Sequence, residues 1–233
     1  MRRLVTCLGV SLLVGCATPA VRPWSARSPE ATATVAPSRA YAVAIAEGLL
    51  GQSTVRIKGR RYPDDCTGLV RGVFESMGVG LFADARRGDN GVTSIFRFAQ
   101  EHGRVFRGGR PLPGDLVFFK DTYDQNHDGR FDDGLTHVGL VERVDEEGTV
   151  TIIHRVRRGI VRFRMNLEHR DERLDAKTGR PFNDFLRAAG PGQKSVLTAQ
   201  LFEAYASVLP THADELPMPG LPVLRPQPEG GSI

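Results

Sequence analysis

The stretch from His137 to Met165 reads HVGLVERVDEEGTVTIIHRVRRGIVRFRM and contains three apolar runs separated by two short turns. The runs are rich in Val and Ile, and the turns at 145–148 and 157–159 combine Gly with charged residues. Strand-length runs joined by such turns predict an antiparallel meander, which an earlier run at 115–119 precedes. The three strands of the stretch are expected at residues 137–144, 149–156 and 160–165.

Helices are expected on either side of this meander. Ser38 can cap a first helix, a second begins near Asp65, and a third begins after Asn90. A late helix is expected at 197–209, where apolar residues recur at helical spacing. Helices first and strands afterwards predict an α+β domain, with N-terminal helices packed on an antiparallel sheet.

The N-terminus has the features of an export signal. Arg2 and Arg3 precede an apolar run at 4–15, which is shorter than the roughly 20 residues of a membrane span. The run ends in Leu-Val-Gly-Cys16, which resembles the bacterial lipobox, where the cysteine is acylated and becomes the first residue of the mature protein. We expect a signal peptide at 1–15 and lipidation of Cys16, with an ordinary cleaved secretory peptide as the alternative.

Composition divides the rest of the chain into three parts. Residues 16–37 are rich in Ala, Thr, Ser and Pro and predict a flexible tether, and residues 210–233 predict a Pro-rich tail. Residues 38–209 between them are numerous enough for one core. The formal net charge of +4 falls by two without the leader, and no Lys/Arg-rich block is present, so we expect no nucleic-acid partner.

Cys66 is the one cysteine that is expected to keep a free thiol. Of the three cysteines, Cys7 leaves with the signal and Cys16 is acylated, so Cys66 has no intramolecular disulfide partner. It stands at the predicted first turn of the second helix, where free N–H groups and the helix dipole favour a thiolate. A free thiol in an exported protein is a candidate nucleophile, and a packed core thiol is the alternative.

Two of the six histidines lie on consecutive predicted strands. His137 opens one strand and His154 lies near the end of the next. Adjacent strands bring side chains close enough for one ring to orient the other. Thiol catalysis needs a thiolate, an imidazole that shares its proton, and a group that orients the imidazole. A lone histidine at a strand end is more often structural, but this pair together with Cys66 favours catalysis.

Four motifs in this order resemble the NlpC-type cell-wall peptidases, a papain-like family of cysteine hydrolases. The motifs are Asp65-Cys-Thr-Gly-Leu-Val70, Pro113-Gly-Asp-Leu-Val-Phe-Phe119, Thr136-His-Val-Gly-Leu-Val141 and Ile152-Ile-His154. The resemblance implies a papain-like fold with Cys66 as nucleophile, His137 as general base and acid, and His154 as the residue that fixes its tautomer. It also implies cleavage of peptidoglycan stem peptides, commonly between γ-D-glutamate and the following diamino acid. Asp65 and Thr67 would help hold the amino end of the stem peptide.

One part of the chain departs from that family. Its members usually carry a Tyr and an aromatic-Gly-Gly stretch about ten residues before the cysteine, whereas this chain has the basic segment VRIKGRRY at 55–62. Tyr62 is a candidate for the missing tyrosine in substrate binding, with a packing or rim tyrosine as the alternative. Residues 166–233 show no match to the family.

The segment from Asp124 to Leu135 has the composition of a calcium loop. Oxygen-bearing side chains occupy positions 1, 3, 5 and 9, Gly129 occupies position 6, and Arg130 is at position 7, where such loops bind through the backbone carbonyl. The twelfth position is Leu135 rather than Glu, so Asp133 or a water would complete the coordination. We expect a structural Ca²⁺, with a solvated acidic turn as the alternative. The oxygen-bearing residues are Asp124, Asn126, Asp128 and Asp132.

These observations predict a cysteine endopeptidase that hydrolyses peptidoglycan and needs no cofactor for catalysis. The lipid on Cys16 would hold it in the cell envelope. Ala17 is not the Asp that retains some lipoproteins at the inner membrane, which favours the outer membrane facing the periplasm. Two alternatives remain open: a papain-like amidase or acyltransferase on another acyl substrate, and a non-catalytic lipoprotein that binds the cell wall.

Overall fold

The computed structural model describes residues 36–190 and 192–212. The predicted signal peptide, the predicted lipidation site Cys16, nearly all of the predicted tether and most of the predicted Pro-rich tail lie outside the described residues. The elements in chain order are α1 (Pro37–Glu47), β1 (Arg56–Ile57), β2 (Arg60–Arg61), α2 (Cys66–Glu75), α3 (Gly91–His102), β3 (Arg104–Phe106), β4 (Leu116–Lys120), β5 (Leu135–Val144), β6 (Val150–Val156), β7 (Gly159–Met165), β8 (Phe185–Arg187), β9 (Val196–Leu197), α4 (Thr198–Leu201) and β10 (Phe202–Ser207).

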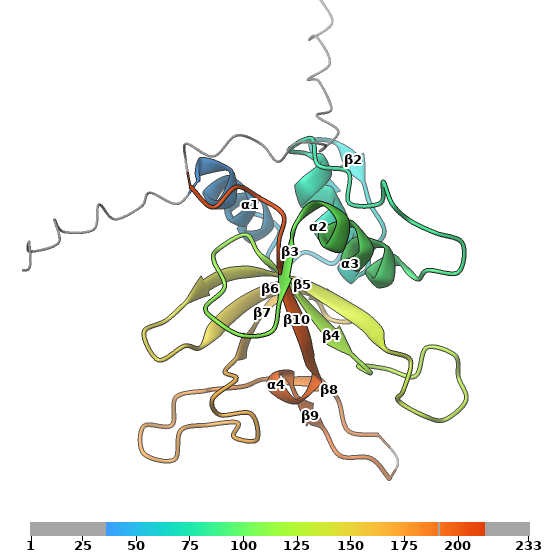
Figure 1. Cartoon of the computed structure of the whole chain (residues 1–233). Coiled ribbons are helices and arrows are strands. Elements are labelled where there is room, and N and C mark those ends of the chain that lie inside the picture. Colours follow the sequence, from blue (N-terminus) through green and yellow to red (C-terminus); the bar gives the residue numbers. More distant parts are fainter. Residues whose placement is uncertain (1–35, 191, 213–233) are drawn as a thin grey trace, which may run out of the picture. The chain divides into compact units, whose positions relative to one another are not determined.

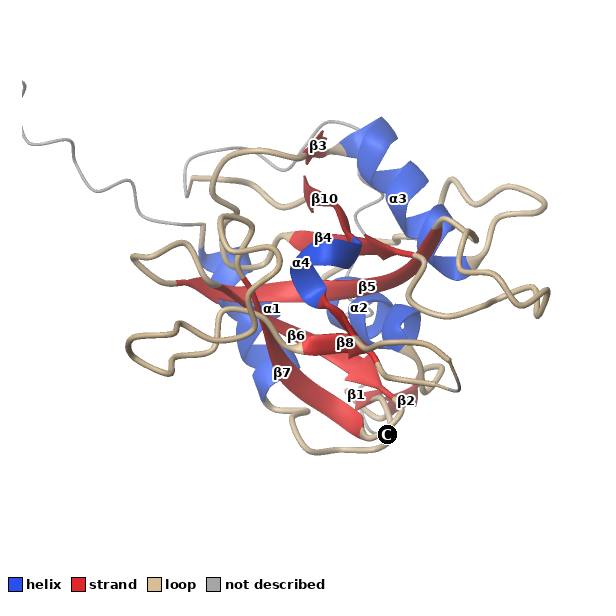
Figure 2. Ribbon diagram, turned by 90° about the horizontal axis from the view of Figure 1, so that it is seen from below, coloured by secondary structure: helices blue, strands red, loops and turns tan. Residues whose placement is uncertain are grey.

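A six-stranded antiparallel sheet with the order β3-β10-β4-β5-β6-β7 is the centre of the domain. The predicted meander is confirmed, because β4, β5, β6 and β7 pair consecutively and antiparallel. Helices α1, α2 and α3 cover one face of this sheet (Figure 1). The segment that carries β8, β9 and α4 crosses the opposite face (Figure 2). The predicted α+β class, with N-terminal helices on an antiparallel sheet, is therefore correct.

Each face of the sheet has its own apolar core. On the helical side Leu69 and Phe74 of α2 pack with Phe98 of α3 and with inward residues of β4 to β7. On the other side Phe119, Ile152 and Tyr205 form a smaller cluster with α4. In the described part of the chain, no helix is long and apolar enough to cross a membrane.

The caps of α2 and α3 confirm the predicted helix starts. The Asp65 carboxylate accepts the Gly68 N–H at 2.8 Å, and the Asn90 side-chain oxygen accepts the Thr93 N–H at 2.8 Å. Each bond satisfies a backbone donor that the first helical turn leaves free. The cap of α1 was predicted wrongly, because this helix begins at Pro37 and Ser38 lies inside its first turn. Proline suits this position, since its missing N–H would have no helical partner there.

The late helix predicted at 197–209 is wrong. Only Thr198–Leu201 is helical, and Phe202–Ser207 forms β10 between β3 and β4, in the interior of the sheet. A strand with sheet neighbours on both sides and a core on each face has a nearly continuous apolar sequence, and such a run has no clear period of two. The two faces are visible in the packing, since Tyr205 belongs to one core and Ala206 to the other.

A buried arginine joins α1 to the end of the domain. Arg39 has no exposed surface, and its guanidinium pairs with Asp115 at 2.7 Å. It also donates to the carbonyl oxygens of Leu209 at 2.8 Å and Pro210 at 2.6 Å. A buried charge with several partners is strongly stabilised in one geometry, so this network fixes the chain that follows β10 against the first helix.

Candidate active site

Cys66 is the first residue of α2, and a close backbone contact fixes its position. A Cβ on Gly68 would lie 1.9 Å from the Pro63 carbonyl oxygen, so the chain before the helix passes over this residue at a distance that only glycine permits. Burial is the largest influence on the pKa of the thiol and raises it, while the backbone N–H groups of Val138, Cys66 and Thr67 act in the opposite direction.

The expected thiolate is not the resting form of this cysteine. Burial raises the pKa of the Cys66 thiol to about 11, and the negative charge of Asp65 adds to that effect. Loss of hydration therefore outweighs the three N–H groups and the helix start. The helix position alone predicts a lowered pKa, whereas burial acts in the opposite direction and is the larger effect.

His137 and His154 form a buried pair, as the strand positions predicted. The Nε2 atom of His137 lies 2.8 Å from the Nδ1 atom of His154. The side chains are 8% and 1% exposed, respectively. Gly139 permits this approach of β5 to β6, because a Cβ there would lie 2.6 Å from the Ile152 side chain. The second ring is held in turn by the edge of Phe163, with centroids 4.4 Å apart.

The pair defines which nitrogen of His137 is available to a thiol. Its Nε2 is bonded to His154, so Nδ1 is the remaining nitrogen. For Nδ1 to carry a lone pair, Nε2 must hold the proton and donate it to His154. Burial lowers the pKa of His137 to about 4 and lowers the pKa of His154 well below its usual value. At neutral pH both rings and the Cys66 thiol are therefore uncharged.

Cys66 and His137 both line a cleft of about 880 Å³. Asp65 and Thr67 also line it, and the Thr67 hydroxyl donates to the Asp65 carboxylate at 2.7 Å. The remaining wall comes from α3, from the loop between β4 and β5, from the end of β6 and from β8. Asp65 and Thr67, which are predicted to bind the substrate, thus line the same cleft as the Cys66 thiol.

Tyr62 is not part of this cleft. Its ring is 6% exposed and packs beside Gly72 of α2, with the Arg60 guanidinium 4.9 Å from its centroid. It does not line the cleft that contains Cys66. The structure corrects the prediction that Tyr62 binds substrate and favours the packing alternative.

Tyr123 takes a position at the site that the sequence did not reveal. It is half-exposed, lies in the loop after β4 and lines the cleft with Cys66. Burial raises the pKa of its hydroxyl. No sequence motif surrounds Tyr123, and only the path of the loop brings it here.

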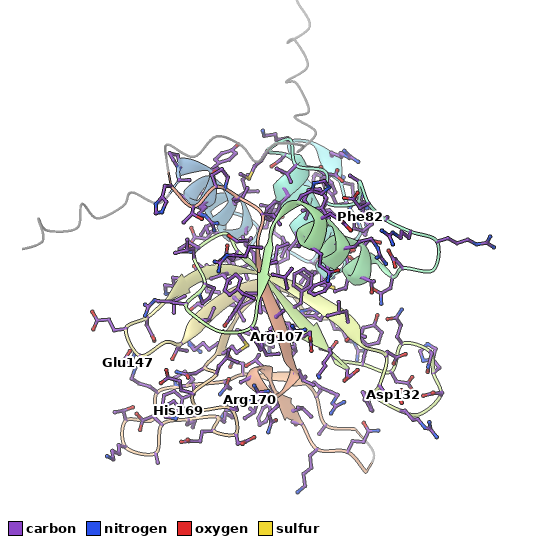
Figure 3. The ribbon with its side chains drawn as sticks, viewed as in Figure 1. Phe82, Arg107, Asp132, Glu147, His169 and Arg170 are labelled. Carbon is purple, nitrogen blue, oxygen red and sulfur yellow. The ribbon has the colours of Figure 1, made fainter. Side chains whose placement is uncertain are left out.

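In the predicted calcium loop, carboxylates accept hydrogen bonds from backbone N–H groups. Asp124 accepts backbone N–H groups from Asp128 and Gly129, and Asp133 accepts one from Gln125. Within residues 36–190 and 192–212, no three His, Cys, Asp or Glu side chains converge to hold a metal ion. Figure 3 shows Asp132 on this loop between β4 and β5. Phe82, which lines the cleft, lies with the helices in the same view. Calcium binding stays a prediction.

A cysteine at the start of a helix, packed against a strand that carries a paired histidine, is compatible with a papain-like thiol hydrolase. Residues 57–155 match the family model of the CHAP domain. This is a cysteine- and histidine-dependent amidohydrolase and peptidase domain related to the NlpC-type papain-like peptidases, which confirms the resemblance seen in the sequence. The match supports a hydrolase that acts on peptidoglycan as an amidase or peptidase. A search of the curated proteins found no match.

Proposed function

We propose that this protein is a cysteine endopeptidase that cleaves peptidoglycan stem peptides at the bond after γ-D-glutamate. The observation that carries the proposal is the 2.8 Å contact between His137 and His154, at a cleft that Cys66 and His137 both line. A nucleophile, a base and an orienting group are thus held by a helix and two neighbouring strands. The CHAP match at residues 57–155 supports the substrate class.

Because the Cys66 thiol and His137 are both uncharged before substrate binds, the first step includes a proton transfer between them. As the sulfur of Cys66 attacks the amide carbon, its proton moves to Nδ1 of His137, and the carbonyl π electrons move onto oxygen. The Nε2–H of the imidazolium donates to His154, which stabilises the charge that appears during attack. The Cys66 backbone N–H at the helix start is a donor for the oxyanion. Charge therefore develops only when substrate occupies the cleft.

The remaining steps return the enzyme to that state. The oxyanion collapses and breaks the C–N bond, while His137 gives its proton to the departing nitrogen. A water molecule then loses a proton to His137 and attacks the thioester, and the second collapse releases the acid and restores the thiol. Asp65, whose carboxylate is exposed in the cleft, is proposed to hold the amino end of the stem peptide.

The cellular setting is part of the same proposal. Acylation of Cys16 would tether the domain through residues 16–37 and hold it at the outer membrane facing the periplasm. A lipid anchor concentrates an enzyme near the wall without a separate wall-binding domain.

Mass spectrometry of muropeptides tests the proposal. Full-length protein in mild detergent is incubated with purified muropeptides beside Cys66→Ala and His137→Ala. We expect new fragments with the wild type only, with masses that place the cleavage after γ-D-glutamate. Cleavage between sugar and peptide would instead identify an amidase. Substantial turnover by Cys66→Ala would refute the cysteine mechanism, and no cleavage by well-folded wild type would favour a binding protein.

A further inference from the structure

One wall of the active-site cleft comes from a part of the chain outside the CHAP match. Leu186 of β8 lines the cleft together with Cys66, although the match ends at residue 155. The neighbouring Arg187 fixes this strand, because its guanidinium donates to the Asp121 carbonyl oxygen at 3.1 Å and lies 4.2 Å from the ring centroid of Phe131. The C-terminal segment is thereby attached to the loop that carries Tyr123 and completes the site.

A second cavity continues from the cleft past this strand. Its volume is about 470 Å³, and Val156, Arg157 and Leu186 belong to the walls of both. Phe163 and Phe185 supply further apolar surface, and Phe185 is 45% exposed. The two spaces share a boundary, so a ligand that reaches Cys66 can extend over Leu186.

The charge of this extension has one sign. Arg157 and Arg158 line it, and none of its lining residues is acidic. Arg158 lies 5.1 Å from the ring centroid of Phe163. Arg157 is exposed and has no hydrogen bond, ion pair or ring contact with any described residue. Its neighbour Arg155, by contrast, donates to the Ser53 carbonyl oxygen at 2.8 Å.

We propose that Arg157 binds a free carboxylate of the peptide substrate, with Leu186 and Phe163 packing against the aliphatic part of the same amino acid. A guanidinium fits a carboxylate with two parallel hydrogen bonds. The inference rests on the proposed function, since a peptide linked through the γ-carboxyl of glutamate keeps its α-carboxylate free. The diamino acid on the other side of the bond offers a second carboxylate. The C-terminal segment is thus a specificity element of the hydrolase.

Defined peptides test this assignment. L-Ala-γ-D-Glu-diamino acid is prepared with both carboxylates free, with the glutamate α-carboxylate amidated, or with the diamino acid carboxylate amidated. For full-length protein in detergent, we expect amidation at one position to raise KM roughly tenfold. In Arg157→Gln we expect the KM of the free acid peptide to rise to that of the amidated peptide, so that this preference is lost. Arg170→Gln is the matched control, because Arg170 is exposed, lies on the segment after β7 and lines neither cavity (Figure 3).

A binding measurement separates this inference from the proposed function. Calorimetry with Cys66→Ala and with Cys66→Ala/Arg157→Gln compares the acid and amide peptides without turnover. Tighter binding of the acid peptide that depends on Arg157 supports the subsite even if the wild type cleaves nothing. Equal affinity of both proteins for acid and amide peptides, with unchanged melting temperatures, would overturn it.

Discussion

The two faces of the sheet are covered in different ways. Against the helices, apolar side chains such as Phe74 and Phe98 fill the space completely. Against the C-terminal segment, the apolar cluster is smaller, and two buried asparagines bond the irregular backbone beside it. Asn183 donates to the carbonyl oxygens of His169 at 2.7 Å and Glu172 at 2.8 Å, and Asn166 donates to the Glu147 carbonyl oxygen at 3.1 Å. Irregular backbone can therefore cover a sheet when side-chain amides satisfy its polar groups.

This difference separates the proposed chemistry from the proposed selectivity. The helical face and the meander hold Cys66 and the two histidines, while the opposite segment contributes Leu186 to the cleft wall. The following changes perturb one face at a time.

The largest expected effect on folding is that of Asn183→Ala. Asn183 is fully buried and its side-chain oxygen also accepts the Asn166 N–H at 2.9 Å. Removing the amide breaks its hydrogen bonds to Asn166, His169, Glu172 and Thr198, so we expect a loss of about 3 kcal/mol in the free energy of unfolding. Urea denaturation measures it, with Gln52→Ala at an exposed position as control. An unchanged midpoint would show that the segment is not held by this residue.

A second effect of similar size follows from the buried pair on the helical face. The pKa of His137 is lowered from 6.5 to about 4, so the unfolded chain takes up a proton first as the pH falls. Stability is complete above pH 6.5 and is lost between there and pH 4, by roughly 3 kcal/mol. His137→Asn should reduce the pH dependence of the melting temperature over this range to the part that His154 supplies, whereas the exposed His127→Asn should leave it unchanged. Equal pH dependence in both variants would contradict the assignment.

The lowered pKa of His137 also sets the acid limb of the pH–rate profile. His137 must be neutral to accept the thiol proton, and its pKa of about 4 keeps it neutral down to that pH. We expect kcat/KM to stay level from pH 7 to 5 and to fall only as the pH approaches 4. A limb near pH 6.5 would show that the imidazole is solvated during turnover.

A smaller effect is expected for Tyr123→Phe, which removes one hydroxyl from the cleft that Cys66 also lines. If that hydroxyl donates to the oxyanion, kcat falls roughly tenfold or more with little change in KM. Tyr41→Phe is the matched control, since Tyr41 is 47% and Tyr123 is 50% exposed. A change in KM alone would make Tyr123 a residue of substrate binding.

The smallest effect concerns calcium at the loop from Asp124 to Asp133. Its carboxylates accept backbone N–H groups in this structure, so an ion must replace those bonds. We expect saturating Ca²⁺ to raise the free energy of unfolding by about 1 kcal/mol relative to EDTA, and Asp124→Asn to abolish the gain. Identical melting curves of the wild type in Ca²⁺ and EDTA would remove the calcium prediction.

Local signals explain what the sequence could predict. The meander, the caps at Asp65 and Asn90 and the pairing of the two histidines all follow from residues that are close in sequence or on neighbouring strands. These features depend on turn residues and caps, which act within a few positions.

Long-range contacts explain what it could not. Whether Phe202–Ser207 forms a helix or a strand depends on its pairing with β3 and β4, which no local pattern encodes. The position of Tyr123 and the covering of the Cys66 sulfur likewise depend on loops folded from elsewhere. A thiol at a helix start has a lowered pKa only while water reaches it, and burial is a tertiary property.

The place of β10 in the sheet also dictates when the domain can be finished. β3 pairs only with β10 among the described strands, and β4 has β10 on one side. Until Ser207 has been synthesised, β3 therefore has no sheet neighbour and β4 presents an open edge. β10 must insert between β3 and β4, which come much earlier in the sequence. This pairing is slow because of the sequence separation. A nascent chain that stops before Phe202 holds every residue of the proposed catalytic pair and its cysteine, yet lacks the strand that joins them into one sheet.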